Sequence, residues 1–149
     1  MSIAQNIVQL KTSLPQGVTL VAVSKFHPVE ALWEAYNAGQ RVFGESRAQE
    51  LSAKQKVLPE DIEWHFIGPL QSNKVKDIVP FIHLIHSIDS LKLLAEVNKQ
   101  AKNTTARSGY YWRSMWRKRN PSTDSVLRNA RSCCVTSPWP NSSIFVFAD

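Results

Sequence analysis

The sequence lacks any apolar run long enough to cross a membrane. Its first residues, MSIAQNIVQLKTSL, also lack the apolar core of a secretory signal peptide. From these two absences we expect a cytoplasmic protein that does not use a membrane as a partner.

Cysteine and glycine are scarce. The two cysteines, Cys133 and Cys134, are adjacent, which is neither a metal-ligand spacing nor a disulfide framework. The five glycines form no GxGxxG and no GxxxxGK[ST] motif after any apolar run, so a nucleotide-binding sheet has no positive support.

Acidic residues are scarce in one part of the chain only. Residues 1–102 hold 11 Lys and Arg against 10 Asp and Glu, whereas residues 103–149 hold 7 against 2. Both cysteines and three of the five tryptophans also lie in the second segment. We therefore predict two parts, a domain over 1–102 and a basic tail over 103–149. The tail stretch RSMWRKR suits contacts with nucleic acid, an alternative that we rank low because the domain itself is close to neutral and +5 of the net charge of +6 lies in the tail.

What the first part does contain is a regular alternation of strand and helix patterns. Short β-branched apolar runs start near 18, 41, 62 and 82, and the segments between them have helical character. A repeat of about twenty residues fits successive right-handed βα units. We predict an α/β fold, the N-terminal half of a (β/α)8 TIM-type barrel with about four βα units and an irregular C-terminal tail. An open doubly wound sheet is the competing architecture.

Polar clusters follow each predicted strand, where barrel folds carry their functional groups. The clusters are SKFHP (24–28), FGESRAQE (43–50), HFIGPLQSNK (65–74) and HSIDS (86–90). Lys25 follows the first strand, where desolvation can free its amine for Schiff-base chemistry. The alternative is a lysine that only extends from the strand end to water.

Three histidines of the first part could suggest a metal. His65, His83 and His86 come from only two strands, His83 lies in the middle of its strand, and no carboxylate is an obvious partner. We favour core or hydrogen-bonded histidines and predict no metal site.

The four clusters, in this order and at these spacings, closely resemble the YggS/PROSC family of pyridoxal 5′-phosphate (PLP) homeostasis proteins, which have the fold of the alanine racemase N-terminal domain. The resemblance covers about residues 1–102. It implies a single-domain (β/α)8 barrel that carries PLP as a Schiff base on the lysine of its first strand, which matches Lys25. Ser46 stands where the family reads FGEN, and His65 and Ser87 match positions that line the cofactor pocket.

The resemblance also implies a function. Family members bind PLP and deliver or buffer it, so apo PLP-dependent enzymes are the expected partners and a carrier is favoured over a catalyst. A racemase-type PLP enzyme is the alternative. Alanine racemase has a second domain that contributes to its site, and this chain has no room for one.

The tail does not match the later barrel strands or the Ser/Met/Gly-rich phosphate-binding segment that the resemblance implies. A shifted frame can be read by joining the third base of one codon to the first two bases of the next. In that frame the Tyr110–Tyr111 and Tyr111–Trp112 junctions must encode Leu, and the Met115–Trp116 junction must encode Val. We hypothesise that the reading frame shifts near residues 103–109, which sequencing of the coding DNA across codons 100–125 tests. We then expect an irregular segment over 103–140, and SIFVFA (143–148) is the strand-like candidate of the tail. We also expect exposed sheet edges, which would allow self-association. PLP binding should be weakened.

Overall fold

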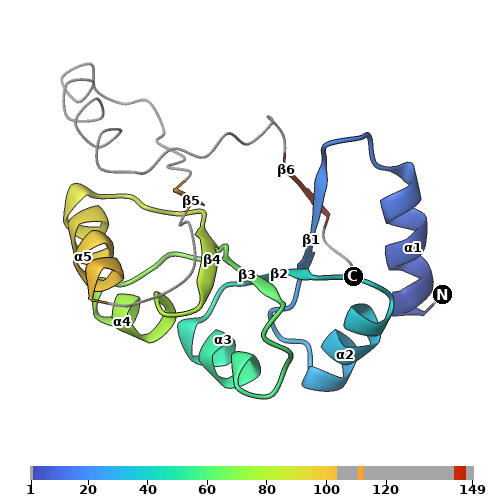
Figure 1. Cartoon of the computed structure of the whole chain (residues 1–149), viewed down its shortest axis with the longest axis horizontal. Coiled ribbons are helices and arrows are strands. Elements are labelled where there is room, and N and C mark those ends of the chain that lie inside the picture. Colours follow the sequence, from blue (N-terminus) through green and yellow to red (C-terminus); the bar gives the residue numbers. More distant parts are fainter. Residues whose placement is uncertain (1, 104–110, 113–142, 147–149) are drawn as a thin grey trace.

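The computed structural model describes residues 2–103, 111–112 and 143–146. The first of these ranges alternates helix and strand, and the other two each add a strand (Figure 1). The elements are α1 (Ile3–Ser13), β1 (Thr19–Val23), α2 (Val29–Asn37), β2 (Val42–Glu45), α3 (Ala48–Gln55), β3 (Glu63–Phe66), the 3-10 helix η1 (Ser72–Lys74), α4 (Val75–Ile78), β4 (Ile82–Ile85), α5 (Leu91–Lys102), β5 (Tyr111–Trp112) and β6 (Ser143–Val146).

The strands form one parallel sheet in the order β5-β4-β3-β2-β1-β6. From β1 to β4 the order follows the chain without reversal, and the helices lie along one side of the curved sheet (Figure 1). A doubly wound sheet reverses its strand order and carries helices on both faces. The prediction of a partial (β/α) barrel is therefore confirmed, and the doubly wound alternative is wrong.

Both outer edges of the four-stranded part are paired. β5 lies beside β4 over two residues, and β6 lies beside β1 over four, from Thr19 with Ser143 to Ala22 with Val146. The SIFVFA prediction is confirmed, the strand at Tyr111–Trp112 was not predicted, and the expectation of unpaired edges is wrong at these positions. The rest of the predicted irregular tail lies outside the described residues.

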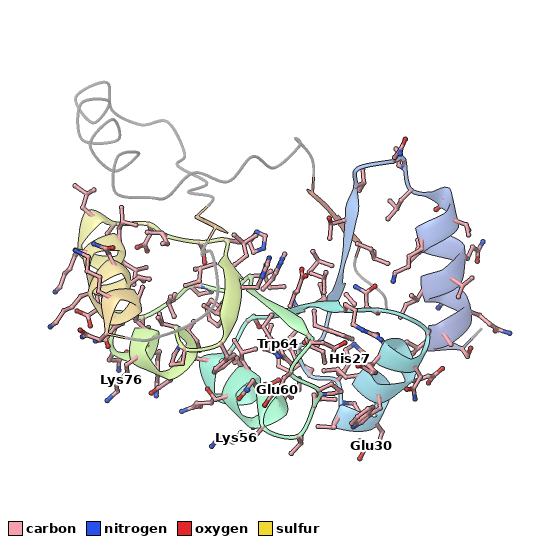
Figure 2. The ribbon with its side chains drawn as sticks, viewed as in Figure 1. His27, Glu30, Lys56, Glu60, Trp64 and Lys76 are labelled. Atoms are coloured by element: carbon pink, nitrogen blue, oxygen red, sulfur yellow. The ribbon has the colours of Figure 1, made fainter. Side chains whose placement is uncertain are left out.

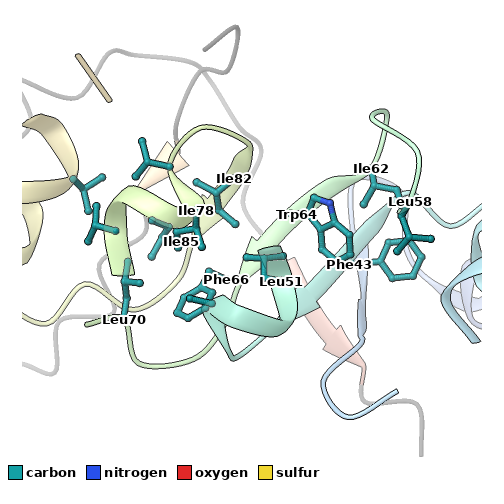
Figure 3. Packing of buried hydrophobic residues seen from close by; sticks show 14 of the residues in the cluster. Phe43, Leu51, Leu58, Ile62, Trp64, Phe66, Leu70, Ile78, Ile82 and Ile85 are labelled. Atoms are coloured by element: carbon teal, nitrogen blue, oxygen red, sulfur yellow. The ribbon is translucent and has the colours of Figure 1, made fainter. Parts of the chain in front are cut away.

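The core lies between the sheet and the helix layer (Figure 3). Trp64 and Phe66 of β3 pack there with Phe43 of β2 and with helix residues such as Leu51 and Ile78. Since side chains alternate along a strand, Glu63 and His65 lie on the opposite, inner face of β3. On β3 the apolar side chains therefore face the helices, and the polar ones face the inside of the arc.

The ends of the helices follow local chemistry. Gly39, with φ 87°, follows the last turn of α2, and the Ser90 hydroxyl accepts from the Leu93 amide at 3.3 Å to cap α5. The helical segment between β3 and β4 divides into η1 and the four-residue α4. Val75 and Ile78 are fully buried, so packing sets the path of this short segment.

Charged side chains cover the outside of the helix layer. Figure 2 shows Glu30, Lys56 and Lys76 directed away from the sheet. No helix in the described ranges has the length and apolar character that a membrane span requires.

Candidate functional site

The loops after β1, β2, β3 and β4 lie together at the carboxyl-terminal end of the sheet, because parallel strands all end there. We call this end the site edge. Gly68, after β3, lies against the backbone of Ser46, after β2. The Gly68 carbonyl oxygen also accepts a hydrogen bond from the Ser87 hydroxyl, after β4. The structure thus brings two of the predicted site residues, Ser46 and Ser87, together around Gly68.

Lys25 lies half-buried just past the end of β1, and helix α3 holds the peptide groups on both sides of it. The Lys54 ammonium donates to the Ser24 carbonyl oxygen at 2.7 Å, and a Glu50 carboxylate oxygen accepts from the Phe26 amide at 3.3 Å. The backbone of Lys25 is therefore held at its carbonyl side and its amide side by two residues one helical turn apart.

Phe26 adopts a strained backbone conformation. Its φ of 64° lies in the left-handed region, which is uncommon for a bulky residue, and its side chain is 68% exposed under the Arg47 guanidinium. A conformation of this kind costs about 1–3 kcal/mol and persists where the surroundings impose it. The turn directly after Lys25 is thus held by its contacts with α3 rather than by local preference.

A buried ion pair supports this turn. Glu45 is fully buried, and its Oε2 lies 2.8 Å from Lys54 Nζ and 3.1 Å from the Ser24 hydroxyl. Its Oε1 accepts from the Ser46 amide at 3.0 Å. Because each carboxylate oxygen has a donor, the charge of Glu45 is compensated without water.

Glu50 carries a negative charge in this arrangement. Desolvation by burial raises the pKa of Glu50, but the Phe26 amide and the positive charges of Lys54 and Arg47 outweigh it, so the pKa is lowered overall. At neutral pH the carboxylate is ionised and accepts from the amide that follows Lys25.

His65 lies apart from these residues, on the inner face of β3. Its side chain is buried, and its Nδ1 lies 3.1 Å from Nε2 of His86, which follows β4. Burial, followed by the neighbouring His86 and His83, lowers the pKa of His65 to about 3, so the ring is neutral. The structure thus joins this predicted site residue to other histidines.

Gly68 should be the least replaceable glycine at the site edge. A Cβ there would lie 2.9 Å from the Ser46 Cα and collide with the Ser46 carbonyl oxygen, so the backbone must move. We expect Gly68→Ala to lower the free energy of unfolding by about 1–3 kcal/mol, measured by urea denaturation.

Gly39→Ala is the matched control for this prediction. A Cβ at Gly39 meets nothing within 4 Å, so only the cost of its positive φ remains. Equal losses in both variants would show that crowding against Ser46 contributes nothing.

Sequence reasoning assigned no role to Glu45, Glu50 or Lys54. The spacing of Glu50 and Lys54, four residues apart on one helix, is a signal that could have indicated their pairing. The contacts of Lys54 with Glu45 and with Ser24 depend on how α3 packs under two strands, and no local pattern indicates them.

A family model described as the alanine racemase N-terminal domain matches residues 1–109. This chain belongs to that family. The four strand-end clusters predicted a resemblance to PLP homeostasis proteins. Relatives with that name confirm it.

Two relatives are similar across the described domain. A pyridoxal phosphate homeostasis protein of Schizosaccharomyces pombe is 55% identical over 85 residues, covering 56% of this chain and 36% of its own. The solved structure of PipY from Synechococcus elongatus with PLP bound is 47% identical with a TM-score of 0.65, covering 68% of this chain and 49% of PipY.

A more distant structure supports the fold alone. Alanine racemase of E. faecalis is 16% identical with a TM-score of 0.63, covering 87% of this chain and 38% of the racemase. This chain therefore spans half or less of each of these three proteins.

Proposed function

We propose that this chain binds PLP covalently through Lys25 and acts in PLP homeostasis as a carrier or buffer. The observation that carries the proposal is the placement of Lys25, which follows the first strand at the site edge, where four strand ends meet, and is held on both sides by α3. PipY, whose structure holds PLP, is 47% identical to this chain and lends support.

The residues at the site edge suit the cofactor. The aldehyde of PLP condenses with a neutral lysine amine and releases one water, which leaves a Schiff base. Fixed peptide groups around Lys25 hold the start of its side chain in place, which lowers the entropy cost of attachment. The Ser46 hydroxyl can donate a hydrogen bond to a bound anion or phenolate. The Ser87 hydroxyl donates to the Gly68 carbonyl oxygen, so it would have to exchange that hydrogen bond for one to the ligand. We assign His65 to the wall of the pocket.

The affinity of this 149-residue chain for PLP should be lower than that of PipY. The described residues supply the covalent anchor, whereas the resemblance assigns the phosphate-binding segment to later strands. The family match ends at residue 109, which supports a division between a partial barrel over 1–102 and a tail over 103–149. It also supports the proposed frame change, for which the coding DNA remains the direct test.

Apo PLP-dependent enzymes are the proposed recipients, and self-association remains a second proposed interaction. A racemase-type activity is the competing function. Turnover of alanine by the chain with added PLP would favour it over a carrier.

Mapping the attachment site tests the proposal directly. The chain is incubated with PLP and reduced with borohydride, and its peptides are examined by mass spectrometry. We expect the pyridoxyl mass to saturate at the peptide that contains Lys25. Lys56 and Lys76, which extend from the outer surface, are internal controls (Figure 2). Labelling of all three in proportion to their exposure, without saturation, would contradict the assignment.

A further inference from the structure

A second group of polar side chains lies on β3 and β4 and extends to the amino-terminal ends of these strands. Glu63 and His65 lie on the inner face of β3, and His83 lies on β4. One ligand atom from each residue lies within 4.8 Å of the other two. We propose that Glu63, His65 and His83 form a binding site for a divalent transition metal, with Zn²⁺ as the representative ion.

An irregularity in the sheet places His83 in this group. Trp64 is paired with Ile82, but His65 is paired with Leu84, so β4 has one extra residue at His83. A bulge of this kind redirects a side chain. The rings of His83 and His65 stack with centroids 5.6 Å apart and planes 5° apart, and His83 Nε2 lies 3.7 Å from a Glu63 carboxylate oxygen.

The donor set favours a transition metal over calcium or magnesium. Two imidazoles and one carboxylate are a known zinc ligand set with a fourth position open to water, whereas calcium and magnesium prefer oxygen ligands. The carboxylate that sequence reasoning could not identify is Glu63, two residues before His65 on the same strand face.

The contact between His65 and His86 suits a metal ligand. Nδ1 of His65 is engaged by His86, which leaves Nε2 as the nitrogen for the ion. Metal-binding histidines commonly use their second nitrogen in such an outer hydrogen bond, which fixes the ring.

A cation can reach this site from solvent. The side chains of Glu63 and His83 are 45% and 32% exposed. Both line a cavity of about 410 Å³ at the amino-terminal ends of β3 and β4, together with the acidic Glu60. Carboxylates around the entrance raise the local concentration of cations.

The test measures metal uptake by the full chain without PLP. Cys133→Ser/Cys134→Ser serves as the background in every sample, so that the tail thiols do not bind metal. After treatment with EDTA and dialysis, Zn²⁺ binding is measured by calorimetry and Co²⁺ binding by visible absorbance. We expect one saturable Zn²⁺ per chain, with affinity reduced at least about tenfold in His83→Ala and in Glu63→Gln.

Two further variants separate ligation from folding. His27→Ala, at an exposed histidine before α2, should leave Zn²⁺ affinity unchanged. His83→Cys should keep binding and add a thiolate-to-cobalt charge-transfer band, which a purely structural role would not produce. An absence of saturable uptake would overturn the proposal and leave a hydrogen-bonded histidine cluster. So would uptake by His83→Ala and Glu63→Gln equal to that of the chain without these substitutions.

Discussion

Lys25→Ala should remove PLP fixed by borohydride and weaken the apparent affinity for PLP by at least about tenfold, or 1.4 kcal/mol. The amine at this position is the proposed covalent attachment point, and the neighbouring hydroxyls offer only hydrogen bonds. Titration with PLP, followed by absorbance of the bound cofactor and by reductive trapping, measures both effects.

Lys56→Ala is the matched control for Lys25→Ala. Lys56 ends α3 and points away from the sheet, so its loss should change neither PLP affinity nor trapping (Figure 2). The proposed role of Lys25 fails if Lys25→Ala traps as much PLP as the unsubstituted chain. It also fails if both alanine variants lose the same amount.

Lys54→Met should destabilise the fold by about 3–5 kcal/mol, because it leaves a buried carboxylate without its counter-charge. The side chain of Lys54 is 8% exposed and that of Glu45 is 0% exposed, so water cannot replace the ammonium. Urea denaturation followed by circular dichroism measures the change in the free energy of unfolding.

A double substitution separates the lost charge pair from lost packing. Glu45→Gln/Lys54→Met removes both charges and should recover most of the stability, whereas Lys56→Met at the surface should change it little. A double variant no more stable than Lys54→Met would show that the ion pair itself is not the origin of the loss.

The loss of Lys54 should affect the proposed PLP site as well as the stability of the fold. Lys54 is the donor to the Ser24 carbonyl oxygen, on the peptide group directly before Lys25. We therefore expect the folded double variant to trap PLP more slowly than the unsubstituted chain, because one side of the Lys25 turn is no longer held.

Much of this architecture could be predicted from local patterns. Apolar runs spaced about twenty residues apart indicated four parallel strands, and Gly39 and the pair Asp89 and Ser90 are residue types typical of helix ends. Both kinds of signal act over a few residues, so they are visible in a linear sequence. The same spacing placed Lys25, Ser46 and Ser87 at strand ends, although it could not say which of them come together.

The sequence by itself determined the alternation of strands and helices, the residues that follow each strand and the family resemblance that these clusters carry. Only the tertiary structure decided that helices cover one face, that β5 and β6 pair with the outer strands, and that Lys54 reaches Glu45 and Ser24. It also decided the position of His83, because one extra residue in β4 turns that ring toward Glu63 and His65. The physical reason is that buried charge pairs and sheet bulges depend on packing between segments distant in sequence, which no local periodicity encodes.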